Sequence, residues 1–190
     1  MTPILSVTCN EPEGPVVRTI EPLVFSKENV HRFWERAKQF PSLYGRQILG
    51  DPQKFMDMFF GVTGNGDPYL NGLFWVVDPA EFLGVFYLNN IEYDRDVPVD
   101  AQVHYTFFDR RQRGRKELVL AMLRYVFNKY KFRRLSVQIP LYTKAHTRHF
   151  VLDLGFSYEG KKRKAAYYND DWFDINLYGL LREDLDGNQN

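Results

Sequence analysis

The segment that decides the fold is Tyr105-Thr-Phe-Phe-Asp-Arg-Arg-Gln-Arg-Gly114-Arg-Lys116, which leads directly into a periodic stretch ending at Tyr130. An apolar strand enters a basic turn that contains a glycine, and the turn opens a helix. Apolar residues then recur at the three- and four-residue spacing of one buried helix face: Leu118, Val119, Met122, Leu123, Val126, Phe127 and Tyr130. A helix N-terminus exposes N–H groups and a positive dipole end, which suit a phosphate. The pattern predicts an anion site here, with a solvated loop as the ordinary alternative.

Composition limits the classes of protein to consider. The chain has 190 residues, and its 16 Phe, 12 Tyr and 3 Trp supply ample material for a core. One domain holds about 100–200 residues, so we expect a single domain. Lys and Arg number 25 against 24 Asp and Glu, so bulk charge favours neither a nucleic-acid nor a membrane partner. Cys9 is the one cysteine, which excludes an intrachain disulfide and a cysteine-based zinc site. We find no apolar run of spanning length and no secretory signal, and therefore expect a cytoplasmic protein.

The remaining pattern predicts a mixed α/β fold over residues 1–190. Residues 1–15 are expected to be an irregular leader, and residues 183–190 a solvated tail. Strands are expected at Val16–Val24, Leu73–Val77, Phe82–Asn89, Ala101–Phe108, Arg134–Ile139, from Phe156, and at Phe173–Leu181, with a polar loop at 93–100. Helices are expected after the N-cap Ser26 and over Pro52–Phe60, Lys116–Tyr130 and Lys144–Leu154. Adjacent strands followed by alternating strands and helices indicate a mixed sheet with helices packed on it.

Two stretches resemble the GNAT acyltransferases. The turn Arg111-x-x-Gly114-x-Lys116 is similar to the pyrophosphate loop of the family, Arg/Gln-x-x-Gly-x-Gly/Ala, at two of its three fixed positions. The stretch from Leu154-Gly-Phe to Leu-Leu-Arg-Glu183 resembles the ending of the branch that includes the ribosomal-protein N-terminal acetyltransferases. There, Gly-Phe is followed by Glu-Gly, a basic residue, an Asn/Gly turn, an aromatic-x-Asp and Tyr-x-Leu-Leu. The resemblance covers residues 73–185 and implies a GNAT-like fold, a mostly antiparallel sheet opened by a splay between two parallel strands.

The resemblance also implies a set of coenzyme contacts. Acetyl-CoA, or another acyl-CoA, would be the co-substrate, with no metal. The strand ending at Phe107 and Phe108 would pair with the pantetheine arm. Arg111 and Gly114 stand at motif positions of the loop. The pyrophosphate would be held by the backbone amides of the loop residues Gln112, Arg113, Gly114, Arg115 and Lys116. Lys144 and Thr147 stand where the family carries an Asn and a small hydroxyl residue, and belong to the predicted coenzyme site.

Two departures from the family pattern concern activity. Lys116 replaces the small last residue of the loop motif, close to the expected phosphates. Val151 stands where many relatives have a tyrosine that serves as general acid, and a valine cannot donate a proton.

Catalysis in this family needs a base for the amine and dipoles that polarise the thioester carbonyl. Many members carry a Glu on the strand that enters the phosphate loop, whereas Ala101–Phe108 holds no carboxylate. His104 is the predicted base, because an imidazole with an ordinary pKa of about 6.5 suits proton transfer near neutrality. Glu92 and Asp94, in the preceding polar loop, are alternative bases. The structural alternative is a histidine satisfied on a half-buried strand.

Three other features of the sequence are not assigned to a separate functional site. His146 and His149 lack a third ligand, so no metal site is predicted. The basic run Lys161–Lys164 could grip nucleic acid or a coenzyme phosphate, and we interpret it as a solvated strand end. The aromatic residues of the early helices are expected mainly in the core, with some lining an acceptor pocket.

The predicted function is acetyl transfer from acetyl-CoA to a primary amine by direct attack in a ternary complex, because Cys9 is poorly placed as a covalent nucleophile. The acceptor is left open among a protein N-terminus, a lysine, a small molecule and a nucleotide, and the chain is expected to be a monomer or homodimer. One alternative is a non-catalytic GNAT-fold binding or regulatory module. Another is a nucleic-acid-modifying relative that uses the Arg110–Lys116 and Lys161–Lys164 charges.

Overall fold

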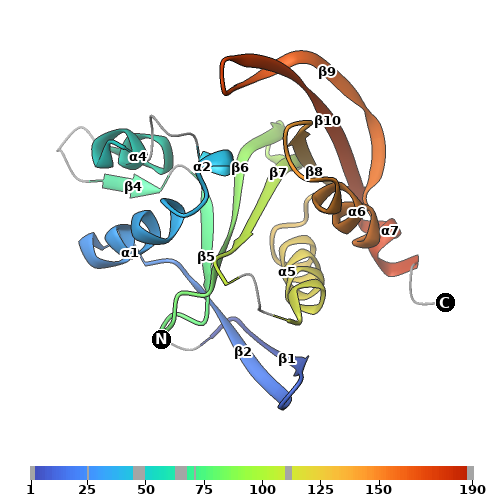
Figure 1. The fold of residues 1–190 in the computed structure, drawn as a ribbon. Coiled ribbons are helices and arrows are strands. Elements are labelled where there is room, and N and C mark those ends of the chain that lie inside the picture. The colour runs from blue at the N-terminus through green and yellow to red at the C-terminus, as the bar shows by residue number, and fades with distance from the viewer. Residues whose placement is uncertain are drawn as a thin grey trace. The chain divides into compact units, whose positions relative to one another are not determined.

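The computed structural model describes residues 3–24, 26–44, 50–62, 68–70, 72–109 and 113–187 (Figure 1). The chain forms two compact units. The first unit contains residues 1–89 and 105–118, and the second contains residues 90–104 and 119–190. The single GNAT-like domain over residues 1–190 stays a prediction.

The first unit begins with a β-hairpin. β1 (Leu5–Glu11) pairs antiparallel with β2 (Gly14–Pro22), so the prediction of an irregular leader over 1–15 is wrong. Pro3 and Pro12 lie outside the paired residues, where a missing N–H costs no ladder hydrogen bond, and Pro15 lies within the pairing, opposite Asn10. Alternation along β1 turns Cys9 into the core, where its side chain is fully buried.

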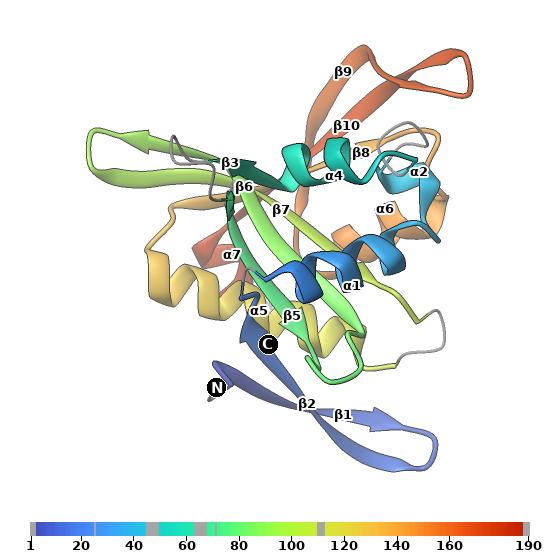
Figure 2. The ribbon, with the colours of Figure 1, turned by 90° about the vertical axis from the view of Figure 1, so that its left-hand side faces the viewer.

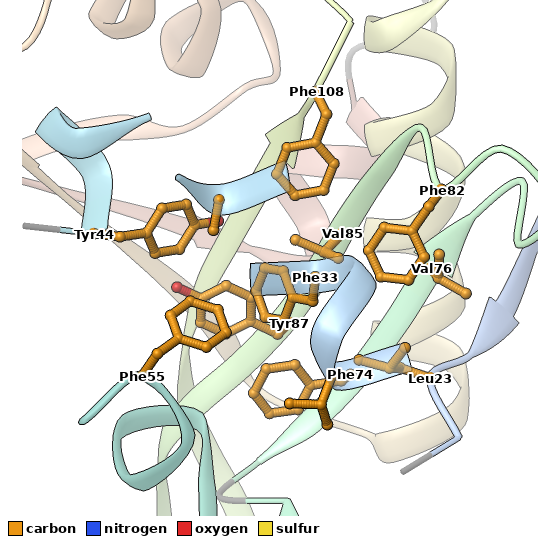
Figure 3. Close-up of a cluster of buried hydrophobic side chains, with 12 residues drawn as sticks. Leu23, Phe33, Tyr44, Phe55, Phe74, Val76, Phe82, Val85, Tyr87 and Phe108 are labelled. Atoms are coloured by element: carbon orange, nitrogen blue, oxygen red, sulfur yellow. The ribbon is translucent and has the colours of Figure 1, made fainter. Parts of the chain in front are cut away.

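The helices of the first unit enclose an aromatic core (Figure 3). α1 (Lys27–Ala37) starts at the predicted N-cap Ser26, whose Oγ accepts a hydrogen bond from the Asn29 N–H at 3.1 Å. α2 (Pro41–Tyr44) and α4 (Pro52–Phe59) follow, and then the short pair β3 (Phe60–Val62) and β4 (Pro68–Leu70). The ring of Phe33 contacts several others, with Phe55 the nearest at 5.1 Å between centroids. Of the early-helix aromatics predicted for the core, Phe33, Tyr44 and Phe55 are buried in this cluster, and Trp34 and Phe40 are partly buried against it. The cluster consists of Leu23, Val30, Phe33, Ala37, Tyr44, Phe55, Phe74, Val76, Phe82, Val85, Tyr87 and Phe108.

Two long strands, each shared between the units, follow β5 (Leu73–Val77). β6 (Gly84–Asp94) and β7 (Val97–Phe107) are joined by a tight turn in which Arg95 has a φ of +55°. The predicted polar loop at 93–100 is therefore wrong, because most of it lies within the two strands. Charged residues do not end the strands, since exposed strand ends tolerate them.

The second unit contains the C-terminal elements (Figure 2). They are most of α5 (Arg115–Tyr130), β8 (Arg134–Pro140), α6 (Ala145–Asp153), β9 (Ser157–Tyr168), β10 (Asp171–Leu181) and α7 (Arg182–Gly187). β9 and β10 form a long hairpin whose turn residues Asn169 and Asp170 both have positive φ, as the predicted turn requires. The predicted tail over 183–190 is wrong in part, because α7 buries Leu185.

The strands join in the order β1-β2-β5-β6-β7-β8-β10-β9. β7 and β8 pair in parallel, whereas the pairs β1–β2, β2–β5, β5–β6, β8–β10 and β9–β10 are antiparallel. This is the mixed, mostly antiparallel sheet that the sequence predicts. Within the described residues, no helix combines the length and the apolar character needed to cross a membrane.

Candidate functional site

The turn between β7 and α5 is the centre of the candidate site. Its described residues are those up to Asp109 and those from Arg113 onward; the predicted contacts Arg111 and Gln112 lie outside the described residues. Gly114 has a φ of +70°, and its carbonyl accepts the first bond of α5 from the Leu118 N–H at 3.0 Å. Gly114 is therefore the N-cap, and the N–H groups of the first helical turn have no intrahelical acceptor.

Cys9 of β1 packs directly against this glycine. A Cβ at Gly114 would lie 2.5 Å from the Cys9 Sγ, and the thiol hydrogen-bonds to the Gly114 carbonyl at 3.8 Å. Burial raises the pKa of the Cys9 thiol, which disfavours the nucleophilic thiolate, and the sulfur packs against the turn. Sequence reasoning missed the role of Cys9, although the alternation Leu5-Ser-Val-Thr-Cys9 is a usable sign of an inward-facing strand position.

The three described cations of the turn differ in their surroundings. Arg113 and Lys116 are exposed. Arg115 is half-buried, and its Nη2 donates to the Asp109 carbonyl at 2.7 Å. Its guanidinium carbon lies 5.6 Å from the centre of the Phe107 ring. Arg113 and Lys116 place two exposed cations beside the N–H groups of the first helical turn, which also carries the exposed Glu117, and such N–H groups suit a phosphate group.

The end of β7 presents one edge to β6 and the other away from it. The Phe108 N–H donates to the Leu83 carbonyl at 2.8 Å, and the Phe108 ring is buried in the aromatic core. Because successive residues of a strand direct their peptide groups to opposite edges, the N–H and C=O of Phe107 point away from β6. Of the two predicted pantetheine contacts, Phe107 is the one with suitably directed backbone groups.

His104 lies on β7, three residues before Phe107. Burial lowers its pKa to about 4, so the imidazole is neutral near pH 7. By strand alternation it shares a face of β7 with Thr106. The hydroxyl of Thr106 is buried and accepts a hydrogen bond from the Tyr44 hydroxyl at 3.1 Å.

The other predicted site residues lie in the second unit. Lys144 is the exposed N-cap of α6 and makes no side-chain capping bond, and the Thr147 N–H donates to the Lys144 carbonyl at 3.0 Å. Val151 is fully buried on the same helix. Glu92 and Asp94 are exposed on β6.

The basic run of β9 is partly neutralised by its neighbours on β10. Lys161 forms an ion pair with Asp174 at 2.9 Å, and the Lys164 Nζ donates to the Trp172 carbonyl at 2.9 Å. His146 and His149 are both exposed on α6, and the described residues contain no cluster of three metal-binding side chains that includes them.

The parallel pairing of β7 with β8 is recorded at one position. Gln102 lies opposite Ser136, whose Oγ donates to the Ala101 carbonyl at 3.5 Å. β7 continues to Phe107 and β8 to Pro140. The family resemblance implies a splay between two parallel strands, and β7 and β8 are the parallel pair of this sheet.

Comparisons with known proteins give this fold several parallels. No curated protein matches the chain by sequence. Among solved structures, a spermidine N-acetyltransferase chimera from Vibrio cholerae and hSSAT has a TM-score of 0.68 and 14% identity, covering 88% of this chain and 97% of that chain. A ribosomal-protein-S5-alanine acetyltransferase from Vibrio fischeri has a TM-score of 0.63 and 15% identity, covering 88% and 94%. A spermidine N-acetyltransferase from Vibrio cholerae in complex with CoA and spermine has a TM-score of 0.66 and 13% identity, covering 88% and 97%.

At these identities the solved structures share the fold, and the family is established by sequence. The family model for the acetyltransferase (GNAT) domain matches residues 67–177, more than half of the chain. The match includes the strand β7, the Gly114 turn and α5, the segment that carries the first part of the resemblance. The chain therefore belongs to the GNAT acetyltransferase family.

Proposed function

We propose that this protein transfers an acetyl group from acetyl-CoA to a primary amine. The observation that carries the proposal is the Gly114 turn at the N-terminus of α5, where a family motif coincides with a positive φ and with the open N–H groups of a first helical turn. Membership in the family supports acyl transfer. Residues of this chain can be assigned to the pyrophosphate and to the pantetheine arm of the co-substrate.

The backbone N–H groups at the start of α5 would hold the pyrophosphate, assisted by the exposed side chains of Arg113 and Lys116. Lys116 adds charge at the position where the family motif has a small residue. The outward-directed backbone groups of Phe107 would pair with the amides of the pantetheine arm. Lys144 and Thr147 are proposed as coenzyme contacts on the family resemblance alone.

Acetyl-CoA supplies a thioester whose carbonyl carbon is open to attack. The amine nitrogen forms the new C–N bond as the C–S bond breaks and CoA leaves as the thiolate, and the proton lost by the nitrogen needs an acceptor. His104 is the proposed acceptor, since a neutral imidazole has one ring nitrogen that can take up a proton. A base with a pKa near 4 draws a proton weakly, so we expect His104→Gln to lower kcat by about tenfold, below the 10²–10⁴-fold typical of general bases.

The solved structures suggest which acceptors to test first. Their names refer to spermidine and to ribosomal-protein-S5 alanine. The panel is therefore spermidine, a peptide with an N-terminal alanine and a peptide with an internal lysine. Each is incubated with acetyl-CoA and protein, and CoA thiol release is measured beside the mass of the product.

Acetylated product on at least one amine is the expected result. His104→Gln is the matched variant for the base, and Gly114→Ala for the coenzyme turn. Lys116 and Val151 favour a second candidate function, a module that binds acyl-CoA without turnover. CoA binding without transfer to any amine in a widened panel would support that module and overturn the enzymatic proposal.

A further inference from the structure

Arg115 is the one described cation of the turn whose side chain is directed back into the turn. Its Nη2 donates to the Asp109 carbonyl at 2.7 Å, and its guanidinium lies over the Phe107 ring at 5.6 Å. Arg113 and Lys116, its neighbours on either side of Gly114–Arg115, are exposed. The family resemblance assigns all three cations to the coenzyme site. Their surroundings differ, because within the described residues only the Arg115 side chain contacts the turn itself.

The contacts of Arg115 connect the two ends of the turn. Asp109 follows β7, and Arg115 is the first residue of α5. A planar guanidinium can donate to a carbonyl and lie on an aromatic face at the same time, which a lysine ammonium cannot do in the same geometry. The Arg115 Nε is buried and has no hydrogen-bond partner within the described residues, so this donor is closed off from solvent.

A second contact fixes the same turn from the side of β1. Gly114 sits against Cys9, with no room for a side chain between them. The turn is therefore held at Gly114 by packing and across its ends by Arg115. Arg113 and Lys116 take no part in these contacts and are exposed.

Resting on the proposed function, we propose that Arg115 is a positioning residue: its guanidinium holds the start of α5 against Asp109, which follows β7, and does not itself contact the phosphates. Replacing it should weaken coenzyme binding by loosening the turn. This differs from the loss of a phosphate contact in two measurable ways, namely the salt dependence of binding and the accessibility of Cys9.

The test compares four single variants with the wild type. Arg115→Met removes the guanidinium and keeps an apolar stem, and Arg115→Lys keeps the charge. Lys116→Met removes an exposed cation of the turn. Lys129→Met removes an exposed cation near the far end of α5 and serves as the matched control. CoA binding is measured by calorimetry at several salt concentrations, with thermal unfolding to confirm folding.

Both Arg115 variants should raise the Kd for CoA by about tenfold, the size of one hydrogen bond to a charged group. Their affinity should keep the wild-type dependence on salt, because no phosphate contact has been removed. Lys116→Met should bind more weakly and with a reduced salt dependence, since screening acts on exposed charge pairs. Lys129→Met should bind as the wild type does.

Cys9 provides a readout of the turn that does not involve the coenzyme. It is the one cysteine of the chain and is fully buried, so its rate of labelling by a thiol reagent reports opening of its contact with Gly114. Labelling should be faster in Arg115→Met than in the wild type under conditions where both are folded.

Wild-type CoA affinity in Arg115→Lys, or a salt dependence reduced as in Lys116→Met, would overturn the proposal and identify Arg115 as a phosphate contact. If the wild-type protein itself fails to bind CoA, the proposed function fails. The labelling rates still decide, in that case, whether Arg115 fixes the turn.

Discussion

At Gly114 the backbone conformation and the neighbouring strand both exclude a side chain. Gly114→Ala would place a Cβ against Cys9 at a φ of +70°, and we expect it to lower the free energy of unfolding by about 1–3 kcal/mol. It should also raise the Kd for CoA at least tenfold. Gly14→Ala is the control, because Gly14 also has a positive φ but a Cβ added there would have no atom within 4 Å. Urea unfolding and calorimetry check both values, and equal CoA affinity in the two variants would contradict the assignment.

The titration of His104 should be visible in the stability of the protein. Its pKa is lowered to about 4 in the fold from an ordinary 6.5, so the unfolded chain binds the proton more readily between these values. The resulting stabilisation is complete above about pH 6.5 and is lost as the pH falls toward 4, by up to about 3 kcal/mol at 1.4 kcal/mol per pKa unit. Urea unfolding at pH 7, 5.5 and 4.5 should show a steeper loss for the wild type than for His104→Gln, and parallel curves would refute the burial of this imidazole.

Among the residues of the candidate site, the sequence predicts some and not others. Gly114 is predictable because its signal is local, a glycine in a basic turn just before a periodic helix. The contact between Cys9 and Gly114 joins residues 105 positions apart, and no periodicity encodes such a pairing. The inward direction of the Arg115 side chain cannot be predicted for another reason. Nothing in a run of cationic residues indicates which side chain contacts its own turn.

At the scale of elements, the helices are predicted more closely than the strands. α1, α4, α5 and α6 lie where caps and periodicity place them, because these signals act within a few residues. The prolines of the β1–β2 hairpin suggest breaks, whereas each strand is stabilised by its pairing partner. Strand formation depends on partners distant in sequence, and composition alone underestimates it.

Within the first unit, the hairpin is joined to β5 by the pairing of β2 with β5 and by a compact ion-pair network. The Arg18 guanidinium contacts Glu11 at 2.6 Å and Asp78 at 2.8 Å, and Asp78 also accepts the Thr19 N–H at 2.8 Å. These side chains are mostly buried, so Arg18→Met should lower the free energy of unfolding by about 1–3 kcal/mol. Because the hairpin carries Cys9, the variant should also weaken CoA binding. Arg18→Lys, which keeps the charge, should lose less stability in urea unfolding, and unchanged stability in Arg18→Met would show that the network contributes nothing net.

At the scale of the whole molecule, a shared fold leaves the acceptor amine unspecified. Solved structures 13–15% identical to this chain keep its topology, and their names refer to different acceptors. The family motif concerns the proposed coenzyme turn, and so the last prediction concerns acetyl-CoA and not the amine.

Acetyl-CoA should therefore stabilise the whole chain against heat. A ligand at about 100 times its Kd adds about 2.7 kcal/mol to a folded protein that binds it, which for a chain of this size corresponds to a rise in Tm of roughly 5–10 °C. The shift should be nearly absent in Gly114→Ala, because that variant spoils the turn. Adenosine diphosphate, which carries a pyrophosphate without the pantetheine arm, should give a smaller shift than acetyl-CoA, since the backbone groups of Phe107 would have nothing to pair with. An equal shift with both ligands would assign the binding to the turn alone and remove the β7 edge from the site. No shift at millimolar acetyl-CoA would mean that Lys116, in place of the small residue of the motif, prevents the turn from binding the coenzyme.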